Sequence, residues 1–218
     1  MKKQLLVGLL ALSMGLSAQA VSIRLLSGAG DSGIITDNTL AGQAVYSGAV
    51  AAWNVNLTTA TSKNILGSSA NPMIDMTSFD STTAGSADSL RILVSDIGFT
   101  GSPLSFLADI SASLNLNNNI TATFNTYADA GNALFGTGTL LTTAPAMVGL
   151  FDNTQTSASQ SFAGPYSLTL EIVLTGTTGP ASTSFDASLH GVPEGGATVG
   201  LLGFALLGIA ALRRKLLK

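Results

Sequence analysis

Short runs in which apolar and polar residues alternate fill the middle of the chain. The clearest run covers residues 166–174, where every second residue from Tyr166 to Leu174 is apolar or aromatic. Because successive side chains of a β-strand point to opposite faces, this pattern predicts a strand with one buried face. Residues 120–127 alternate in the same way, and residues 90–97 are apolar on both faces, which is typical of a central strand. Further strands are expected at residues 21–26, 44–59, 73–79, 147–151, 157–162 and 184–189.

These runs predict an all-β fold for residues 21–191. Turn-forming Gly, Asn, Asp, Ser and Thr residues separate the runs, and no long segment has the spacing of an amphipathic helix. Eight to ten strands of this kind favour an antiparallel β-sandwich, either a jelly roll or an immunoglobulin-like fold. One short helix is expected at residues 102–109, and the biased segments 114–121 and 137–143 are expected to be loops.

Residues 1–20 have the three parts of a secretory signal peptide. Lys2 and Lys3 are followed by an apolar run at residues 5–16, and then by Ala18-Gln19-Ala20. The apolar run is shorter than the roughly 20 residues that span a bilayer, and the small residues fit a signal peptidase site. We therefore expect an N-terminal signal helix, export through the Sec machinery and cleavage after Ala20. The alternative is an uncleaved anchor.

Residues 192–218 form a second tripartite segment. A short motif at residues 192–196 precedes an uncharged segment at 197–212 and a basic tail at 213–218. Sixteen helical residues extend about 24 Å, slightly less than the roughly 30 Å hydrocarbon core, so the segment predicts a marginal transmembrane helix. Arg213, Arg214 and Lys215 would hold that end in the cytoplasm and leave the middle of the chain outside. An ordinary single-pass anchor is the alternative.

The order of these parts resembles the PEP-CTERM class of protein-sorting signals. The motif Val192-Pro193-Glu194-Gly195-Gly196 is similar to the VPDSG variant, with Glu in place of Asp. The resemblance implies recognition and cleavage by a membrane-embedded exosortase of a Gram-negative bacterium, with transient membrane anchoring. It implies delivery to the cell surface or the extracellular matrix. We expect the scissile bond near residues 193–196.

The charge balance and the reactive residue types of residues 21–192 limit the functions that we expect for this part of the chain. Residues 21–192 hold three basic and eleven acidic residues, a formal balance of −8, which argues against nucleic-acid binding. The chain has no Cys, and its one His, His190, stands in the expected stalk before the motif. No G-x-S-x-G motif occurs. We therefore expect no catalytic site, no metal site and no cofactor, and a protein that is not an enzyme.

Two weaker signals were weighed against plainer interpretations. Acids near Gly or Asn in expected loops suggest calcium, but no D-x-D-x-D-G loop occurs, so solubilising surface acids are favoured; these acids are Asp31, Asp37, Asp129 and Asp152. Trp53, Tyr46 and Tyr127 suggest a sugar-stacking platform, although a lone Trp in a strand is more often core. Two functions are therefore expected: a structural surface or matrix protein, or a module that binds extracellular polysaccharide.

Overall fold

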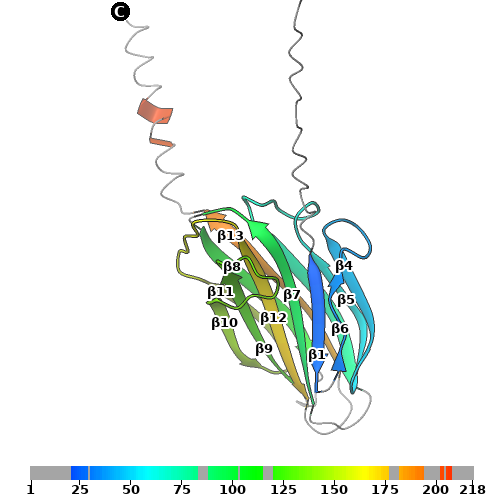
Figure 1. The fold of residues 1–218 in the computed structure, drawn as a ribbon. Coiled ribbons are helices and arrows are strands. Elements are labelled where there is room, and N and C mark those ends of the chain that lie inside the picture. The colour runs from blue at the N-terminus through cyan, green and yellow to red at the C-terminus, as the bar shows by residue number, and fades with distance from the viewer. Residues whose placement is uncertain are drawn as a thin grey trace, which may run out of the picture.

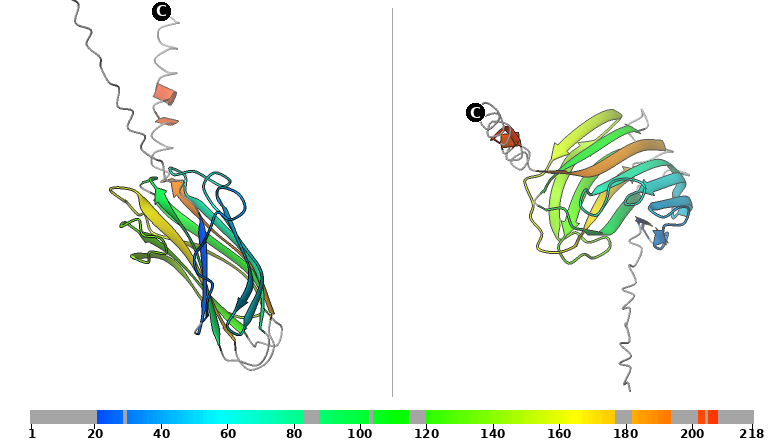
Figure 2. Two further views of the ribbon diagram at one scale, coloured as in Figure 1. Left: turned by 45° about the vertical axis from the view of Figure 1, so that its right-hand side comes forward. Right: turned by 90° about the horizontal axis from the view of Figure 1, so that it is seen from above.

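The computed structural model describes residues 21–28, 30–82, 88–102, 104–114, 120–176, 182–193, 202–203 and 205–207. The expected signal peptide at residues 1–20, with Ala18 and Ala20, lies outside them. The described residues form two antiparallel β-sheets packed face to face, so the predicted all-β sandwich is confirmed (Figure 1). Figure 2 shows the two layers seen from above.

Thirteen strands make up the two sheets of the described chain. Seven of them form sheet A, in the order β10-β9-β12-β7-β1-β2, with β3 also paired to β1. Six form sheet B, in the order β11-β8-β13-β6-β5-β4. Their bounds are β1 Ser22–Ser27, β2 Gly30–Asp31, β3 Ile35–Thr36, β4 Gln43–Val50, β5 Trp53–Thr61, β6 Met73–Thr82, β7 Ser89–Phe99, β8 Leu104–Leu114, β9 Ile120–Asp129, β10 Thr139–Met147, β11 Leu150–Thr156, β12 Tyr166–Gly176 and β13 Ser182–Pro193.

The last eight strands pair in a nested order. Strand β6 pairs with β13, β7 with β12, β8 with β11, and β9 with β10. Successive pairs in this series lie in alternate sheets, so the chain crosses repeatedly from one sheet to the other. The last strand, β13, therefore lies between β6 and β8 in the middle of sheet B.

The core lies between the sheets and follows the alternation that the sequence shows. In β12 the even-numbered residues from Leu168 to Leu174 are fully buried. These β12 residues face sheet B, where β8 and β13 contribute buried residues to the same core, among them Phe106, Ile110 and Leu189. Each of these strands contributes one apolar face, as the period of two requires.

Most of the expected strands are confirmed, with boundaries shifted by a few residues. The expectations at 21–26, 73–79, 90–97, 120–127, 166–174 and 184–189 correspond to β1, β6, β7, β9, β12 and β13. Residues 44–59 form two strands, because the chain turns between Val50 and Trp53 with Ala51 at a positive φ of 50°.

Four local expectations are wrong. Residues 102–109 are mostly strand β8, because the core-facing set Leu104, Phe106 and Ala108 alternates, and the outward Leu107 masked that period. Residues 147–151 contain the turn between β10 and β11, where Gly149 has a φ of 70°. Residues 137–143 enter strand β10, and residues 157–162 carry no named strand.

The expected transmembrane helix at residues 197–212 lies largely outside the described residues. Residues 202–203 and 205–207 are helical. Among the described residues, no helix has the length and apolar character needed to cross a membrane.

Candidate functional site

The expected sorting region begins inside the fold. Strand β13 remains paired with β8 up to its last residue, with Gly191 opposite Phe106, Val192 opposite Ser105 and Pro193 opposite Leu104. Val192 is extended, as the following proline predicts, and its side chain is 41% exposed. His190, expected in a stalk, instead lies in the sheet between Met73 and Leu107. No free stalk therefore separates the sandwich from residues 192 and 193.

Close packing fixes the chain at Gly191. Its N–H donates to the carbonyl of Pro72 at 2.9 Å. A Cβ placed there would lie 2.7 Å from Leu104 Cδ1 and 2.8 Å from Pro72 Cγ. Only glycine fits at this contact without displacing its neighbours. The junction between the sandwich and the following segment is thus held by the core side of sheet B.

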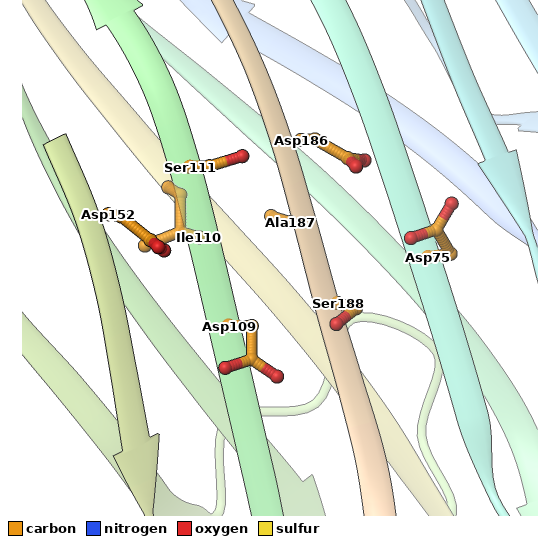
Figure 3. Close-up of a pocket in the computed structure, with 8 residues that line it drawn as sticks. All are labelled: Asp75, Asp109, Ile110, Ser111, Asp152, Asp186, Ala187 and Ser188. Carbon is orange, nitrogen blue, oxygen red and sulfur yellow. The ribbon is translucent and has the colours of Figure 1, made fainter. Parts of the chain in front are cut away.

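The outer face of sheet B gathers acidic side chains from four neighbouring strands. Ser188 is paired with Asp75 on one side and Asp109 on the other, and Ser111 is paired with both Asp186 and Asp152. Because alternate residues share a face, these two rows lie next to each other on the surface. Figure 3 shows the four carboxylates around a shallow hollow of about 100 Å³. We call this set, with Ser111 and Ser188, the acidic face.

Burial and a neighbouring negative charge raise the pKa of one carboxyl group of the acidic face, that of Asp75. Asp75 is partly buried, and this burial, together with the charge of Asp186, raises its pKa to about 6. Asp186 accepts a hydrogen bond from the Thr77 hydroxyl at 2.9 Å. The face can therefore offer hydrogen-bond acceptors and hydroxyl groups to a ligand. Among the described residues, no group of His, Cys, Asp or Glu side chains is arranged to hold a metal ion.

Comparison with known proteins identifies the segment that follows β13. Residues 191–216 match the VPDSG-CTERM motif. This segment is a PEP-CTERM-like sorting signal, as its three-part pattern predicts. The motif implies export and surface association of the protein. No curated protein matches the chain in sequence.

A solved structure that is similar to this chain is titled "Structure of infectious bursal disease virus Gx strain". It shares 12% identity with this chain at a TM-score of 0.33, and the alignment covers 86% of this chain. The chain spans about half the length of that viral protein, 53% of it.

The sorting signal begins at Gly191, so its first three residues belong to strand β13. The other residues singled out in the sequence lie outside the described part of the chain: Glu194, Gly195, Gly196, Arg213, Arg214 and Lys215. The sequence pattern located the signal, whereas its attachment to the middle of sheet B depends on strand order. No local signal in residues 184–193 carries that order.

The three aromatic residues that suggested a sugar-stacking platform do not form one, and the favoured interpretation of Trp53 as a core residue is confirmed. Trp53 is 0% exposed and belongs to the core, which confirms the plainer interpretation. Tyr127 lies on sheet A, whereas Tyr46 lies on sheet B, where its hydroxyl donates to the Ala49 carbonyl at 3.2 Å. The three rings therefore do not form one surface.

Three of the four acids that suggested calcium have other settings in the fold, whereas Oδ1 of the fourth, Asp37, is buried with no hydrogen-bond partner among the described residues. Asp31 pairs with Arg24 at 2.8 Å, and hydrogen bonds from Arg24 and from the Gly33 N–H hold the pKa of Asp31 below its usual value. Asp129 caps its turn by accepting from the Gly131 N–H at 2.8 Å. Asp152 lies in strand β11, not in a loop, and belongs to the acidic face.

A polar cluster that the sequence analysis did not find lies on the outer face of sheet A. Glu171, 5% exposed on β12, forms an ion pair with Arg91 of β7. Its other oxygen accepts from Tyr127 at 2.9 Å and from Asn125 at 3.2 Å. Burial and the bond to Glu171 raise the pKa of Tyr127 to about 12. Both carboxylate oxygens are thus satisfied, which is what a structural buried acid requires.

We predict that Asp75→Asn stabilises the protein at pH 7. The folded pKa of about 6 lies above the ordinary value near 4, so the folded state binds a proton that the unfolded chain has released between these pH values. The contribution of Asp75 is therefore most favourable below about pH 4 and is lost as the pH rises through about 6. We expect a gain on the order of 1 kcal/mol, reduced by solvent screening, from urea unfolding at pH 7.

The same comparison at pH 4 should show little difference between Asp75→Asn and the parent. Asp152→Asn removes one negative charge from the edge strand β11, which is separated from β6 by β13 and β8, and serves as the control for net charge. A parent protein as stable as Asp75→Asn at pH 7 contradicts the predicted burial of this carboxyl.

Proposed function

We propose that the protein is an exported, non-enzymatic component of the cell surface or extracellular matrix. Its signal peptide directs it through the Sec machinery, and its C-terminal signal delivers it to an exosortase that processes it. The observation that supports this function best is the VPDSG-CTERM match at residues 191–216, which follows directly from the last strand of the sandwich. The middle of the chain, residues 21–191, is the cargo, and residues 192–218 direct its sorting.

The path of the cargo follows from the expected segments. Residues 197–212 form a helix that anchors the protein transiently in the inner membrane, with Arg213, Arg214 and Lys215 on the cytoplasmic side. Signal peptidase removes residues 1–20 at Ala18-Gln19-Ala20, and the exosortase then releases the sandwich. Strand β1 begins and strand β13 ends at the same end of the sandwich (Figure 1). This arrangement supports processing of both termini on one side of the folded cargo.

The packing at the junction favours cleavage after Pro193 rather than before it. Residues 191–193 are hydrogen-bonded into sheet B, and a protease needs an extended substrate strand free of such pairing. We therefore propose that the scissile bond lies C-terminal to Pro193, within residues 193–196. The processed protein keeps the complete strand β13.

The absence of enzymatic activity is supported by where the reactive groups lie. His190 is flanked across the sheet by Met73 and Leu107, so neither cross-strand partner is a carboxylate. Glu171 is buried and bound by three side chains, which leaves it no access to substrate. These environments suit structural roles.

The nested pairing favours the jelly roll over the immunoglobulin-like alternative. In β6 to β13, the first strand pairs with the last, the second with the next to last, and so on inward. A double-sheet jelly roll of eight strands is built from such wrapped pairs. Strands β1 to β5 extend the two sheets at the edges formed by β7 and β6.

The acidic face supports polysaccharide binding as a second candidate function. Its carboxylates and serine hydroxyls suit hydrogen bonding to sugar hydroxyls, and they line one hollow on the outer face of sheet B (Figure 3). The loss of the Trp53 platform removes the stacking contribution that a tight sugar site needs, so the structural role is the better supported.

We predict that replacing Val192, Pro193 and Glu194 together with alanine abolishes exosortase processing in the native host. The motif is read directly by the enzyme, so the uncleaved form should accumulate in the membrane fraction, seen by immunoblot and intact mass. A triple alanine variant of Ser182, Ser184 and Ser188, all on the outer face of the same strand, is the matched control and should be processed normally.

The C-terminal residue of the released wild-type protein is read in the same experiment. Unchanged processing of the Val192–Glu194 variant would falsify the sorting role of this motif. Release of a product that ends before Pro193 would contradict the proposed position of the scissile bond.

We predict that the processed protein binds extracellular polysaccharide of its host weakly, if the second function holds, and that binding requires the acidic face. Asp186→Ala with Ser188→Ala should lower affinity in a polysaccharide pull-down by about thirtyfold, because each of the two lost hydrogen bonds is worth about 1 kcal/mol. Thr123→Ala with Thr143→Ala, on the outer face of sheet A, is the control. Equal retention of both variants excludes the acidic face as the binding surface.

A further inference from the structure

A buried lysine and a buried aspartate join the two sheets. Lys63 lies in the turn after β5 of sheet B and is 5% exposed, whereas Asp96 lies on β7 of sheet A and is 0% exposed. Lys63 Nζ and Asp96 Oδ1 are 2.8 Å apart. Gly42 packs so tightly under this turn that a Cβ there would lie 2.1 Å from the Lys63 carbonyl oxygen. Close backbone packing therefore fixes the turn from which the Lys63 side chain reaches Asp96.

The two oxygens of Asp96 have unequal surroundings. Oδ1 accepts from Lys63 Nζ and also from the Ile97 N–H at 2.7 Å. Oδ2 is buried and has no hydrogen-bond partner among the described residues. Lys63 Nζ also donates to the Ile97 carbonyl and lies 4.0 Å from the centre of the Phe99 ring.

This arrangement is costly for an ion pair. Two charges have been taken out of water, and one carboxylate oxygen has lost its water without gaining a partner. Burial lowers the pKa of Lys63, and it outweighs the charges of Asp96 and Asp37, which act in the opposite direction. A lysine desolvated beside an aromatic ring has access to its neutral, nucleophilic form.

We propose that Lys63 and Asp96 condense to form an intramolecular amide bond. A proton passes from the Lys63 ammonium to Asp96 Oδ2, and the neutral Nζ attacks Asp96 Cγ. A second proton from the amine follows to Oδ2, the Cγ–Oδ2 bond breaks, and Oδ2 leaves as water. The positive and negative charges cancel, and the step needs no oxidant and no activated group.

The linked form satisfies the polar atoms that the ion pair leaves unsatisfied. Oδ1 becomes the amide oxygen and keeps the Ile97 N–H as its donor. The one hydrogen left on Nζ has the Ile97 carbonyl as its acceptor. The oxygen without a partner is the one that departs. The two charges disappear from the core at the same time, which removes their desolvation cost.

The bond would connect the two layers at the end of the sandwich where the sorting signal begins. Strand β5 ends just before Lys63, and β6 starts at Met73, opposite His190 of β13. A covalent closure between residues 63 and 96 restrains the unfolded chain as a disulfide does. The chain has no Cys, so this amide would supply an exported protein with a cross-link that reduction cannot break.

The intact mass of the purified, natively folded protein tests the proposal. The wild-type chain should weigh one water molecule less than its sequence, after its termini have been assigned from the terminal peptides. Protease digestion should yield a branched peptide that joins the segments around Lys63 and Asp96. Lys63→Arg keeps the positive charge but cannot form this amide, so it should have the full mass of its sequence, as should Asp96→Ala.

Folded wild-type protein with the full mass of its sequence and only linear peptides overturns the proposal. The wild-type measurement decides without the variants, so a variant that fails to fold leaves the answer intact. The cross-link forms within the sandwich and does not depend on exosortase, so its presence or absence leaves the proposed function untouched.

Discussion

Sheet B depends on its central strand, and that strand is the last one in the sandwich. Strand β13 lies between β6 and β8, and its inward residues Phe185, Ala187 and Leu189 are buried in the core. Without β13 the two neighbouring strands lose their shared partner and the core loses one wall. The sorting signal begins on this same strand, at Gly191. The segment that directs the protein is therefore continuous with the part of the chain that completes its fold.

The nested order of the strands means that most strand pairs join segments that are distant in the sequence. The pairs β6–β13 and β7–β12 join segments that lie far apart in the sequence, and only β9 and β10 pair as near neighbours in the series. Folding dominated by distant pairs is slow, because loop-closure entropy is lost before the contacts form. The proposed amide between Lys63 and Asp96 would hold the two layers together once this order has been reached. The proposed exosortase cleavage then separates the sandwich from the sorting signal only after the last residue of β13.

The sequence predicted elements better than it predicted their partners. The alternation at residues 166–174 and 120–127 located β12 and β9, because burial of one face imposes a period of two. Residues 102–109 were misassigned, since Leu107 lies on the outer face and breaks the visible period of β8. Residues 44–59 form two strands because Ala51 adopts a positive φ in the turn between them. Alanine rarely adopts this conformation, so the residue type did not predict the turn.

The candidate sites divide in the same way. The sorting signal is local, so its residue order alone located it. The acidic face, the Glu171 cluster and the Lys63–Asp96 pair each join side chains from segments that are distant in the sequence, and their contacts depend on strand order and register. Trp53 was rightly favoured as core, because a large aromatic ring in an alternating strand stabilises most when it is buried.

The central claim is that β13 is an integral strand up to the sorting signal, and amide hydrogen exchange on the full chain tests it most directly. The account predicts that the amides of residues 185–191, including the Gly191 N–H bonded to Pro72, exchange as slowly as those of β8 and more slowly than those of the edge strand β11. Exchange of residues 185–191 as rapid as in an unfolded peptide would contradict it.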